Sequence, residues 1–501
     1  MQMDTPIVDF AARYAQSGIS RLHMPGHKGQ NFLGVEARDI TEIQGADELY
    51  EAEGIIARSE ANATRLFGTA HTYYSTEGSS QCIRAMLFLA LQAAPQTGGR
   101  PILLAARNAH KALLYAAALL DFDIRWLWPA PEEMGALCSC PVHPAALQTA
   151  LERLRRNGEK PFGVYMTSPD YLGNLQDIAG LSEICSAVSV PLLVDNAHGA
   201  YLRFLPGGRH PIGLGAAMCC DSGHKTLPVL TGGAYLHLGK NAPIQDESIV
   251  RNALALFGST SPSYLILQSL DRCNRYLAEG YPIRLLQCLR ELDLLRQELN
   301  ELAQQAGAVR PFALDGHLKN PAREPLKLTL DAAALGLTGT QLAETLRKNG
   351  VECEYADPRY LVLMFTPENP PRDYEKLTEA VRTLCQTLPE AVQGGAEADE
   401  VACAAAFAAL REQAETKCTI RQAVFAAQER VSASAALGRI CAMPAVSCPP
   451  AIPIAVSGEV ITPAAVELFE RYGMETLSVT CDDSSPKGRA LGKQANLRKT
   501  E

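Results

Sequence analysis

The sequence lacks the cysteine spacing of a zinc or redox site. Its 15 cysteines include no Cys-x-x-Cys motif, and the nearest pairs are Cys138 with Cys140 and Cys219 with Cys220. Neither spacing is that of a zinc site. An odd number of cysteines scattered through apolar stretches is typical of reduced, buried thiols. We therefore expect no metal site in this chain.

The sequence also lacks a long apolar run and an excess of positive charge. No run reaches the ~20 residues that span a bilayer, and residues 1–18 carry an early acid and no signal-type apolar core. The net charge is −9 and the isoelectric point about 5.7, which disfavours nucleic acid and anionic membranes as partners. These absences predict a cytoplasmic protein with neither a membrane nor a nucleic acid as its partner.

The length of 501 residues, of which 47% are apolar and 20% charged, allows two or three domains. The pattern of apolar runs changes near residue 275, before a long predicted helix at 283–307, and a plausible linker lies at 392–400. We expect an irregular N-terminal segment, a large cofactor-binding domain, a small α/β domain, a C-terminal domain and a disordered tail, over residues 1–50, 51–275, 276–392, 400–480 and 482–501.

Short apolar runs alternate with helical stretches through the large domain. Strands are predicted at 101–106, 123–128, 162–168, 190–195 and 216–221. Strands that alternate with helices indicate a mostly parallel sheet, and continuously apolar strands indicate a sheet buried on both faces. The predicted fold class is α/β, with helices on both faces of the large sheet.

The later part of the chain is expected to add a smaller α/β unit and a third region. Strand-like runs at 325–330 and 360–366 flank a predicted helix at 340–349. A further helix is predicted at 419–431, within the C-terminal domain.

A glycine and two serines mark the first candidate site. The stretch "STEGSSQ" at 75–81 ends a predicted strand and opens a helix. Gly78 allows a sharp turn, and Ser79 and Ser80 add hydroxyls to the exposed amides of the helix N-terminus, which favours binding of an anion such as phosphate. A plain helix N-cap is the alternative interpretation.

Two further polar residues follow strands, at the edge where a parallel sheet binds its ligand. Asp195 in "VDNAHGA" ends an apolar strand, where a carboxylate requires a positive partner such as a protonated ring nitrogen. Capping of the next element is its alternative role. His110 in "RNAH" follows another strand, where an imidazole suits stacking on a flat ligand or an ordinary cap.

A lysine completes the set. Lys225 in "DSGHK" follows the strand at 216–221, and Ser222 and His224 stand beside it. A desolvated ammonium has a lowered pKa and becomes a nucleophile, whereas a solvated loop lysine is the alternative. An amine for an aldehyde, a carboxylate for a pyridine nitrogen and a phosphate cup are what pyridoxal 5'-phosphate requires. The four features together predict that cofactor.

With these residues the chain resembles the Orn/Lys/Arg decarboxylase family, in its shorter bacterial form without an N-terminal wing domain. The motifs are collinear and cover nearly the whole chain short of the tail, and "HKTLP" with "STSPSY" is specific. They are "HMPGHKG" (23–29), "RNAHK" (107–111), "VDNAHGA" (194–200), "HKTLPVLT" (224–231), "STSPSYLILQSLD" (259–271) and "GRICAMPAVSCPPAIPIAVSGEVIT" (438–462). The resemblance implies a fold-type-I, pyridoxal phosphate-dependent enzyme.

The resemblance also implies a role for each candidate residue. Lys225 would bind the aldehyde of the cofactor, Asp195 would pair with its ring nitrogen, and His110 would stack on the ring. Ala197 would pack against the opposite face of the ring. The phosphate would be held by Gly78, Ser79, Ser80, Ser222 and His224.

The "STSPSY" segment resembles one that reaches the cofactor of a neighbouring subunit. Ser259 and Thr260 would then act across an interface, which implies a homodimer or a higher homo-oligomer. Locally the segment also has the pattern of a helix N-cap with a proline near the first turn, and the two interpretations are compatible.

Six positions depart from the family pattern, among them Cys448 for a tyrosine and Ala451 for a glycine. The other four bear on the substrate and the activity. Asn196 stands where an acid is usual, Asp170 where a threonine is common, Gly232 where a glutamine is usual, and Met443 where a glutamate is usual. Asp170 would add a carboxylate for a basic side chain or would cap the adjoining turn. The cofactor set is intact, so these departures leave the substrate and the level of activity open.

The resemblance implies decarboxylation of arginine, lysine or ornithine to carbon dioxide and the corresponding amine, with arginine slightly favoured by analogy with the short bacterial form. One alternative is another pyridoxal phosphate reaction on the same fold, by a lyase, aldolase or aminotransferase. An aminotransferase usually needs an arginine for the α-carboxylate, and no motif places one. The other alternative is a low-activity homologue that acts as a regulator, which the intact Lys225 and Asp195 disfavour.

Overall fold

The computed structural model describes residues 3–95, 98–388, 396–444 and 452–481. The expected disordered tail at 482–501 lies outside these ranges. None of the helices within them combines the length and the apolarity needed to cross a membrane.

The large domain is built on a seven-stranded sheet with the strand order β1-β7-β6-β5-β4-β2-β3. The strands are β1 (His71–Ser75), β2 (Ile102–Ala106), β3 (Asp123–Leu127), β4 (Gly163–Thr167), β5 (Leu192–Asp195), β6 (Met218–Asp221) and β7 (Ala234–Leu238). Of the seven, β7 alone runs opposite to the other six and pairs antiparallel with both β1 and β6. The prediction of a mostly parallel sheet is therefore confirmed.

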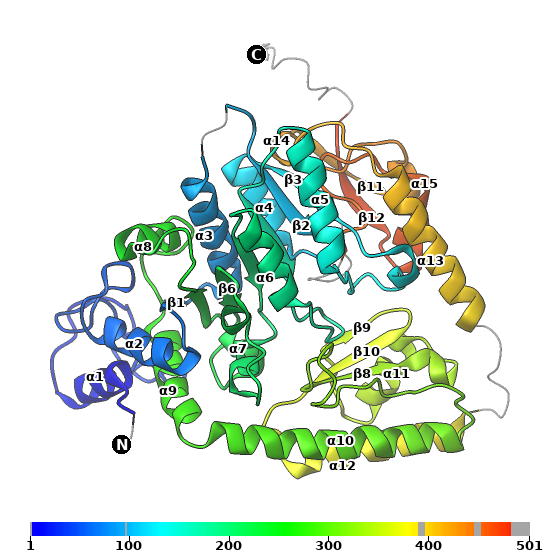
Figure 1. The fold of residues 1–501 in the computed structure, drawn as a ribbon. Helices are drawn as coiled ribbons and strands as arrows, with labels where there is room; N and C mark the ends of the chain where they lie inside the picture. Colours follow the sequence, from blue (N-terminus) through cyan, green and yellow to red (C-terminus); the bar gives the residue numbers. More distant parts are fainter. Residues whose placement is uncertain (1–2, 96–97, 389–395, 445–451, 482–501) are drawn as a thin grey trace, which may run out of the picture.

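Helices cover both faces of this sheet (Figure 1), as the continuously apolar strands require. On one face lie α3 (Gly78–Ala93), α4 (Lys111–Leu120) and α8 (Glu247–Ala255), and on the other lie α5 (Pro144–Arg156) and α6 (Ile178–Ala187). The edge strand β1 packs against α2 (Ile55–Phe67), which in turn contacts α9 (Tyr264–Ala278).

A second, three-stranded sheet has the order β8-β10-β9. Its strands are β8 (Lys327–Asp331), β9 (Tyr355–Ala356) and β10 (Tyr360–Met364), with α11 (Gly339–Lys348) between β8 and β9. Two long helices, α10 (Tyr281–Gln305) and α12 (Pro371–Thr387), pack side by side beneath it (Figure 1). This unit matches the smaller α/β arrangement that the sequence predicts.

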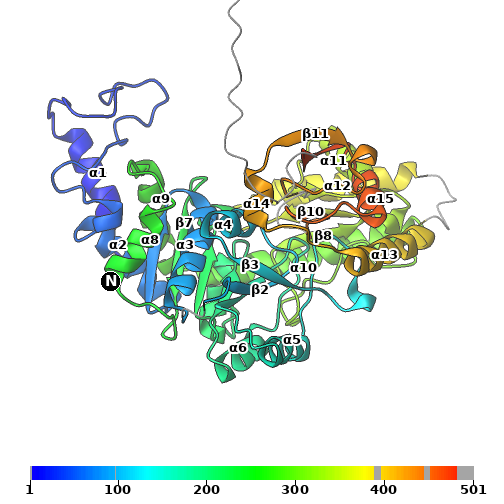
Figure 2. The ribbon, with the colours of Figure 1, turned by 90° about the horizontal axis from the view of Figure 1, so that it is seen from above.

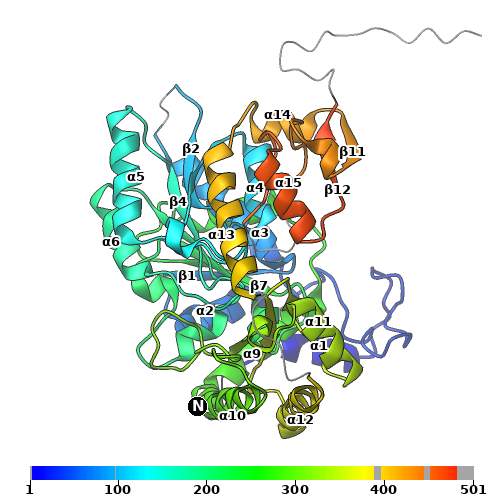
Figure 3. The ribbon, with the colours of Figure 1, turned by 90° about the vertical axis from the view of Figure 1, so that its right-hand side faces the viewer.

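The C-terminal region differs from the sequence-based expectation in two places. The prediction of a helix at 419–431 is wrong for its second half. The helix α14 (Ile420–Phe425) ends at Phe425, and the strand β11 (Gln428–Ser432) that follows pairs with β12 (Thr476–Thr480). The partner strand lies some fifty residues later, so helical spacing gives no sign of it. Figure 3 shows α13 (Ala396–Gln413) packed beside α15 (Pro463–Arg471), and α13 begins inside the predicted linker.

The expected irregular N-terminal segment contains a helix, α1 (Pro6–Gln16). Proline at its first position fits the start of a helix, and Asp271 on α9 accepts hydrogen bonds from the backbone N–H of Ile7 (2.9 Å) and Val8 (3.0 Å). Tertiary contact with α9 therefore stabilises a helix that its own short apolar pattern does not reveal. The loop after α1 lies at the outer margin of the molecule (Figure 2).

A buried ion pair joins the C-terminal region to the end of β2. Arg107 donates to both carboxylate oxygens of Glu459, at 2.7 and 2.8 Å, and its guanidinium lies between the rings of Trp126 (4.9 Å) and Trp128 (4.7 Å). Arg107 is only 1% exposed, and Glu459 also accepts a hydrogen bond from the backbone N–H of Val456. The charge of Arg107 is thus fully compensated by a residue of another domain.

We expect the variant E459Q to lower the free energy of unfolding by about 3–5 kcal/mol, because it leaves the Arg107 guanidinium buried without a counter-ion. The matched control is E429Q, which removes a carboxylate from the half-exposed pair of Arg439 and Glu429 and should cost about 0–1 kcal/mol. Denaturant unfolding measures both. Equal losses for the two variants would show that the buried pair contributes no more to the free energy of unfolding than the half-exposed pair does.

The raised pKa of Asp271 predicts that the stabilities of the wild type and of the variant D271N depend differently on pH. Burial raises the pKa of Asp271 from 3.8 to about 6, so the folded state binds the proton more tightly than the unfolded state. The resulting stability is fully present below pH ~4 and is lost as the pH rises through ~6. From pH 7 to pH 5 the wild type should gain about 1 kcal/mol relative to D271N. Unfolding at both pH values tests this, and parallel changes in the two proteins would contradict it.

Candidate active site

The candidate residues meet at one edge of the large sheet. Asp195 is the last residue of β5, Lys225 lies on the short helix α7 (Gly223–Thr226) after β6, and His110 caps α4 after β2. The turn at Gly78 follows β1 and opens α3. Because the carboxyl ends of parallel strands lie at the same edge, residues more than 140 positions apart come together there.

Lys225 is half-buried and contacts a histidine. Its Nζ lies 3.0 Å from Nε2 of His198, which is itself 1% exposed. Burial, and after it the charge of Lys225, holds the pKa of His198 well below its usual value. A neutral imidazole whose Nε2 accepts a hydrogen bond from the lysine carries its proton on Nδ1, and that atom has no partner among the described residues.

Asp195 is buried and its carboxylate is held in one orientation. Tyr165 donates its hydroxyl to Oδ2 at 3.1 Å, and the backbone N–H of Ala197 donates to Oδ1 at 3.1 Å. Burial and the Asp195 charge raise the pKa of Tyr165 well above its ordinary value, so this phenol remains a donor. The thiol of Cys220 also donates to Oδ1, at 3.6 Å. The carboxylate is therefore fixed by three donors, none of which carries a positive charge.

His110 is fixed by its role as a helix cap. Its Nδ1 accepts a hydrogen bond from the backbone N–H of Ala112 at 3.2 Å. Burial lowers the pKa of His110 to about 4, so the ring is neutral near pH 7. A neutral, oriented imidazole presents a flat surface without adding a charge to the edge of the sheet.

The turn before α3 is supported by a second glycine. Gly78 has a φ of +70°, and a Cβ there would meet nothing within 4 Å. Its N–H donates to the carbonyl of Gly232 at 2.7 Å. Gly232 has a φ of +99°, and a Cβ on it would lie 2.9 Å from the carbonyl oxygen of Thr76. The departure at Gly232 thus allows β7 to approach this turn closely.

Several buried polar groups at this edge have no protein partner in the described part of the chain. They are Thr76 Oγ1, both amide atoms of Asn108, His198 Nδ1, Ser222 Oγ and Thr226 Oγ1. Buried polar groups are normally hydrogen-bonded, so a cluster of unpaired ones indicates a polar ligand. Hydroxyls beside a helix N-terminus and an open space at Gly78 fit a phosphate group.

The other predicted residues occupy different surroundings. Ser79 is 9% exposed and Ser80 is half-buried, both in the first turn of α3, and His224 Nδ1 lies 3.0 Å from the carbonyl oxygen of Gly233. Ser259 and Thr260 are exposed and precede α9. Within a single chain these last two residues are at the surface.

The small sheet contributes a buried lysine that the motifs do not reveal. Lys327 on β8 donates from Nζ to the backbone carbonyl of Asp170 at 2.8 Å and lies 5.5 Å from the ring of Tyr171. That ring packs edge-on against His198, with 4.9 Å between the ring centroids. Burial lowers the pKa of Lys327. Lys225 and Lys327 are thus linked through two aromatic rings, and both rings follow strands.

Asp170, one of the departures from the family pattern, has a local explanation. The carboxylate of Asp170 accepts hydrogen bonds from the backbone N–H (2.8 Å) and the side-chain amide (2.7 Å) of Asn174, so it caps the turn after β4. Met443 is 46% exposed. Of the two roles that the sequence left open for Asp170, its hydrogen bonds are those of a turn cap.

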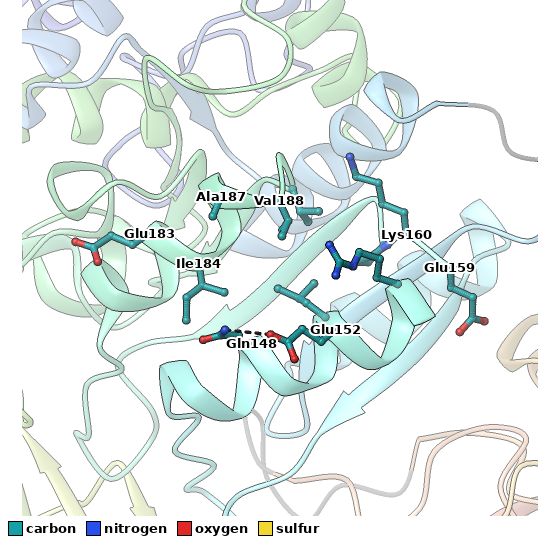
Figure 4. Close-up of a pocket in the computed structure, with 12 residues that line it drawn as sticks. Gln148, Glu152, Glu159, Lys160, Glu183, Ile184, Ala187 and Val188 are labelled. Carbon is teal, nitrogen blue, oxygen red and sulfur yellow. Dashed lines mark hydrogen bonds between the residues drawn. The ribbon is translucent and has the colours of Figure 1, made fainter. Parts of the chain in front are cut away.

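A groove on the outer face of the large domain is separate from this edge. It lies between α5 and α6 (Figure 4), has a volume of about 650 Å³, and is lined by residues that include Gln148, Glu152, Lys160, Glu183 and Val188. None of the candidate residues lines it. The groove is therefore distinct from the candidate site at the strand ends.

The α/β fold with its mostly parallel sheet is shared with solved decarboxylase structures. The structure of lysine decarboxylase A from Pseudomonas aeruginosa aligns with a TM-score of 0.76 over 93% of this chain and 75% of that one, at 18% identity. The structure of the E. coli constitutive lysine decarboxylase aligns with a TM-score of 0.73 over 95% and 82%, also at 18% identity.

The sequence comparison identifies the family. The model described as "Orn/Lys/Arg decarboxylase, major domain" matches residues 5–372, and the chain belongs to this family. It is 27% identical over 487 residues to the arginine decarboxylase of Bacillus subtilis (strain 168), with 92% of each chain covered. The resemblance stated from the motifs is confirmed, and the chain is an enzyme, a carboxy-lyase of the basic amino acid decarboxylase family.

Proposed function

We propose that this enzyme decarboxylates a basic amino acid with pyridoxal 5'-phosphate, and that arginine is the preferred substrate. The observation that carries the proposal is the meeting of Lys225, Asp195 and His110 at one sheet edge, with Lys225 Nζ 3.0 Å from a neutral histidine. Relatives that span 92% of this chain and carry the name arginine decarboxylase favour arginine over lysine and ornithine.

The residues at the sheet edge would divide the binding of the cofactor among them. Lys225 would bind its aldehyde, Asp195 its ring nitrogen, His110 one face of its ring and Ala197 the other. The phosphate would lie at the N-terminus of α3, held by Gly78, Ser79, Ser80, Ser222 and His224. When bound, the cofactor supplies an electron sink for the electrons of the bond to the departing carboxylate.

Asp195 would hold a proton on the ring nitrogen of the cofactor. Tyr165 and the N–H of Ala197 fix its carboxylate, so no reorganisation is required when charge develops. His110, neutral and capped in place, would exclude water from one side of the reacting carbon.

Lys225 or His198 would donate the proton that returns to the substrate carbon. His198 orients the amine through Nε2, and its Nδ1–H is the one donor on that ring left for a ligand. The amine of Lys225 lies within hydrogen-bond reach of His198. Either group would be placed to deliver the proton.

The proposal includes a homodimer at least. Ser259 and Thr260 are exposed just before α9 and would reach the cofactor of the second subunit. The cytoplasmic location and the identity of the substrate stay predictions from the sequence.

The substrate is tested by incubating the purified holoenzyme with L-arginine, L-lysine and L-ornithine separately. We expect carbon dioxide from each competent substrate, and agmatine from arginine to form with the highest kcat/KM. The variant K225A removes the nucleophile and should lower kcat by more than about 10³-fold. Formation of keto acid in place of amine would favour an aminotransferase, and no product from any of the three would contradict decarboxylation of basic amino acids.

The cofactor assignment is tested without turnover. Protein saturated with pyridoxal 5'-phosphate should absorb in the visible, and borohydride should fix the cofactor covalently to Lys225, as peptide mapping would show. K327A serves as the control, because Lys327 is the second buried lysine near the site and should leave the label in place. A colourless protein, or a label on another lysine, would overturn the site.

A further inference from the structure

Asp221 is the centre of a hydrogen-bonded cluster behind the candidate site. Its Oδ1 accepts a hydrogen bond from Nδ2 of Asn196 at 2.6 Å, and its Oδ2 lies 3.0 Å from Nε2 of His210 and 3.1 Å from Nε2 of His237. We call these four residues the Asp221 cluster. All four are at most 1% exposed, so water does not share in these contacts.

The Asp221 carboxylate is the acceptor at the centre of the cluster. The Nδ1 of His237 lies 2.8 Å from the hydroxyl oxygen of Thr72, so this ring donates through Nε2 and accepts through Nδ1. Burial acts to raise the pKa of Asp221, but the two histidines hold it well below its ordinary value, and burial lowers the pKa of His237. An ionised carboxylate with three N–H donors accounts for every one of these distances.

A metal ion explains the cluster less well. The thiol of Cys219 lies 3.9 Å from Nε2 of His210, and donor atoms of Cys219, His210 and Asp221 are near enough to share an ion. Burial raises the pKa of the Cys219 thiol well above its usual value, and a protonated thiol does not bind metal. Both carboxylate oxygens already accept hydrogen bonds.

The position of the cluster connects it to the chemistry. Asn196 directly follows Asp195, and Asp221 ends β6 four residues before Lys225. The register pairs Asp195 with Cys220, and successive side chains of a strand alternate between faces. Asn196 and Asp221 therefore bridge β5 and β6 on the face opposite the Asp195 carboxylate.

We propose that Asp221 is a positioning residue, which fixes the spacing between Asp195 and Lys225 by holding the ends of β5 and β6 together. The family pattern has an acid at position 196, where this chain has asparagine. Here Asp221 supplies a carboxylate from β6 instead. The inference rests on the proposed function, because one cofactor must reach both Asp195 and Lys225. A change in the spacing of the two strand ends then weakens the binding of that cofactor.

The test exchanges the amide and the carboxylate between the two strands. In N196D a carboxylate replaces the amide that donates to Asp221 Oδ1 at 2.6 Å, so two carboxylates face each other with no donor between them. We expect at least tenfold weaker binding of pyridoxal 5'-phosphate. In N196D/D221N the amide at position 221 again accepts from both histidines and donates to the new carboxylate at 196. We expect the double variant to recover most of the lost affinity, whereas D221L, which removes every hydrogen bond, should lose it.

The measurements are the cofactor dissociation constant, from titration of apoprotein with pyridoxal 5'-phosphate, and the melting temperature of each apoprotein. The matched control is D271N, which alters a buried carboxylate on α9 that binds the first turn of α1 and Ser59 and makes no contact with the Asp221 cluster. It should lower the melting temperature without weakening cofactor binding. If N196D alone does not fold and N196D/D221N does, the rescue itself demonstrates the pairing.

The outcomes separate the two proposals. A wild-type protein that binds no pyridoxal phosphate would overturn the proposed function, and this inference with it. Wild-type affinity in N196D or D221L would overturn the positioning role alone. So would losses of affinity in the double variant that equal or exceed those in N196D, because the two side chains would then act independently.

Discussion

The parallel pairing of β4, β5 and β6 is the constraint on which the site depends. Backbone hydrogen bonds between these strands fix their register, and the register decides which side chains face each other at the carboxyl edge. A slip of one residue would turn Asp195 away from Tyr165 and toward the opposite face. The chemistry is thus set by backbone geometry before any side chain makes a contact.

The buried strands and the residues that directly follow them were accessible from the sequence. Lys225 and Asp195 stand out because a charged residue at the end of an apolar run requires an explanation. Tyr165, His198 and Asp221 did not stand out, because their partners lie on other strands and a pattern along one strand carries no information about its neighbour. The second half of the predicted helix at 419–431 failed for the same reason, since β12 supplies its hydrogen bonds.

Two other parts of the chain complete the large domain. Lys327 of the small sheet reaches the loop after β4, where its ammonium donates to the carbonyl of Asp170 and lies over the ring of Tyr171. Glu459 of the C-terminal region binds Arg107, which precedes His110 by three residues. The candidate site residues lie at the edge of the large sheet, but their surroundings include residues of the small sheet and of the C-terminal region.

The distance along the chain between Arg107 and Glu459 has a consequence for synthesis on the ribosome. The two residues are 352 positions apart, so the guanidinium is made long before its carboxylate. Until residue 459 has been synthesised, the end of β2 carries a charge between two indole rings without the anion that it meets in the folded structure. The segment that leads from β2 to His110 can therefore reach its folded geometry only after a residue 352 positions away has been made.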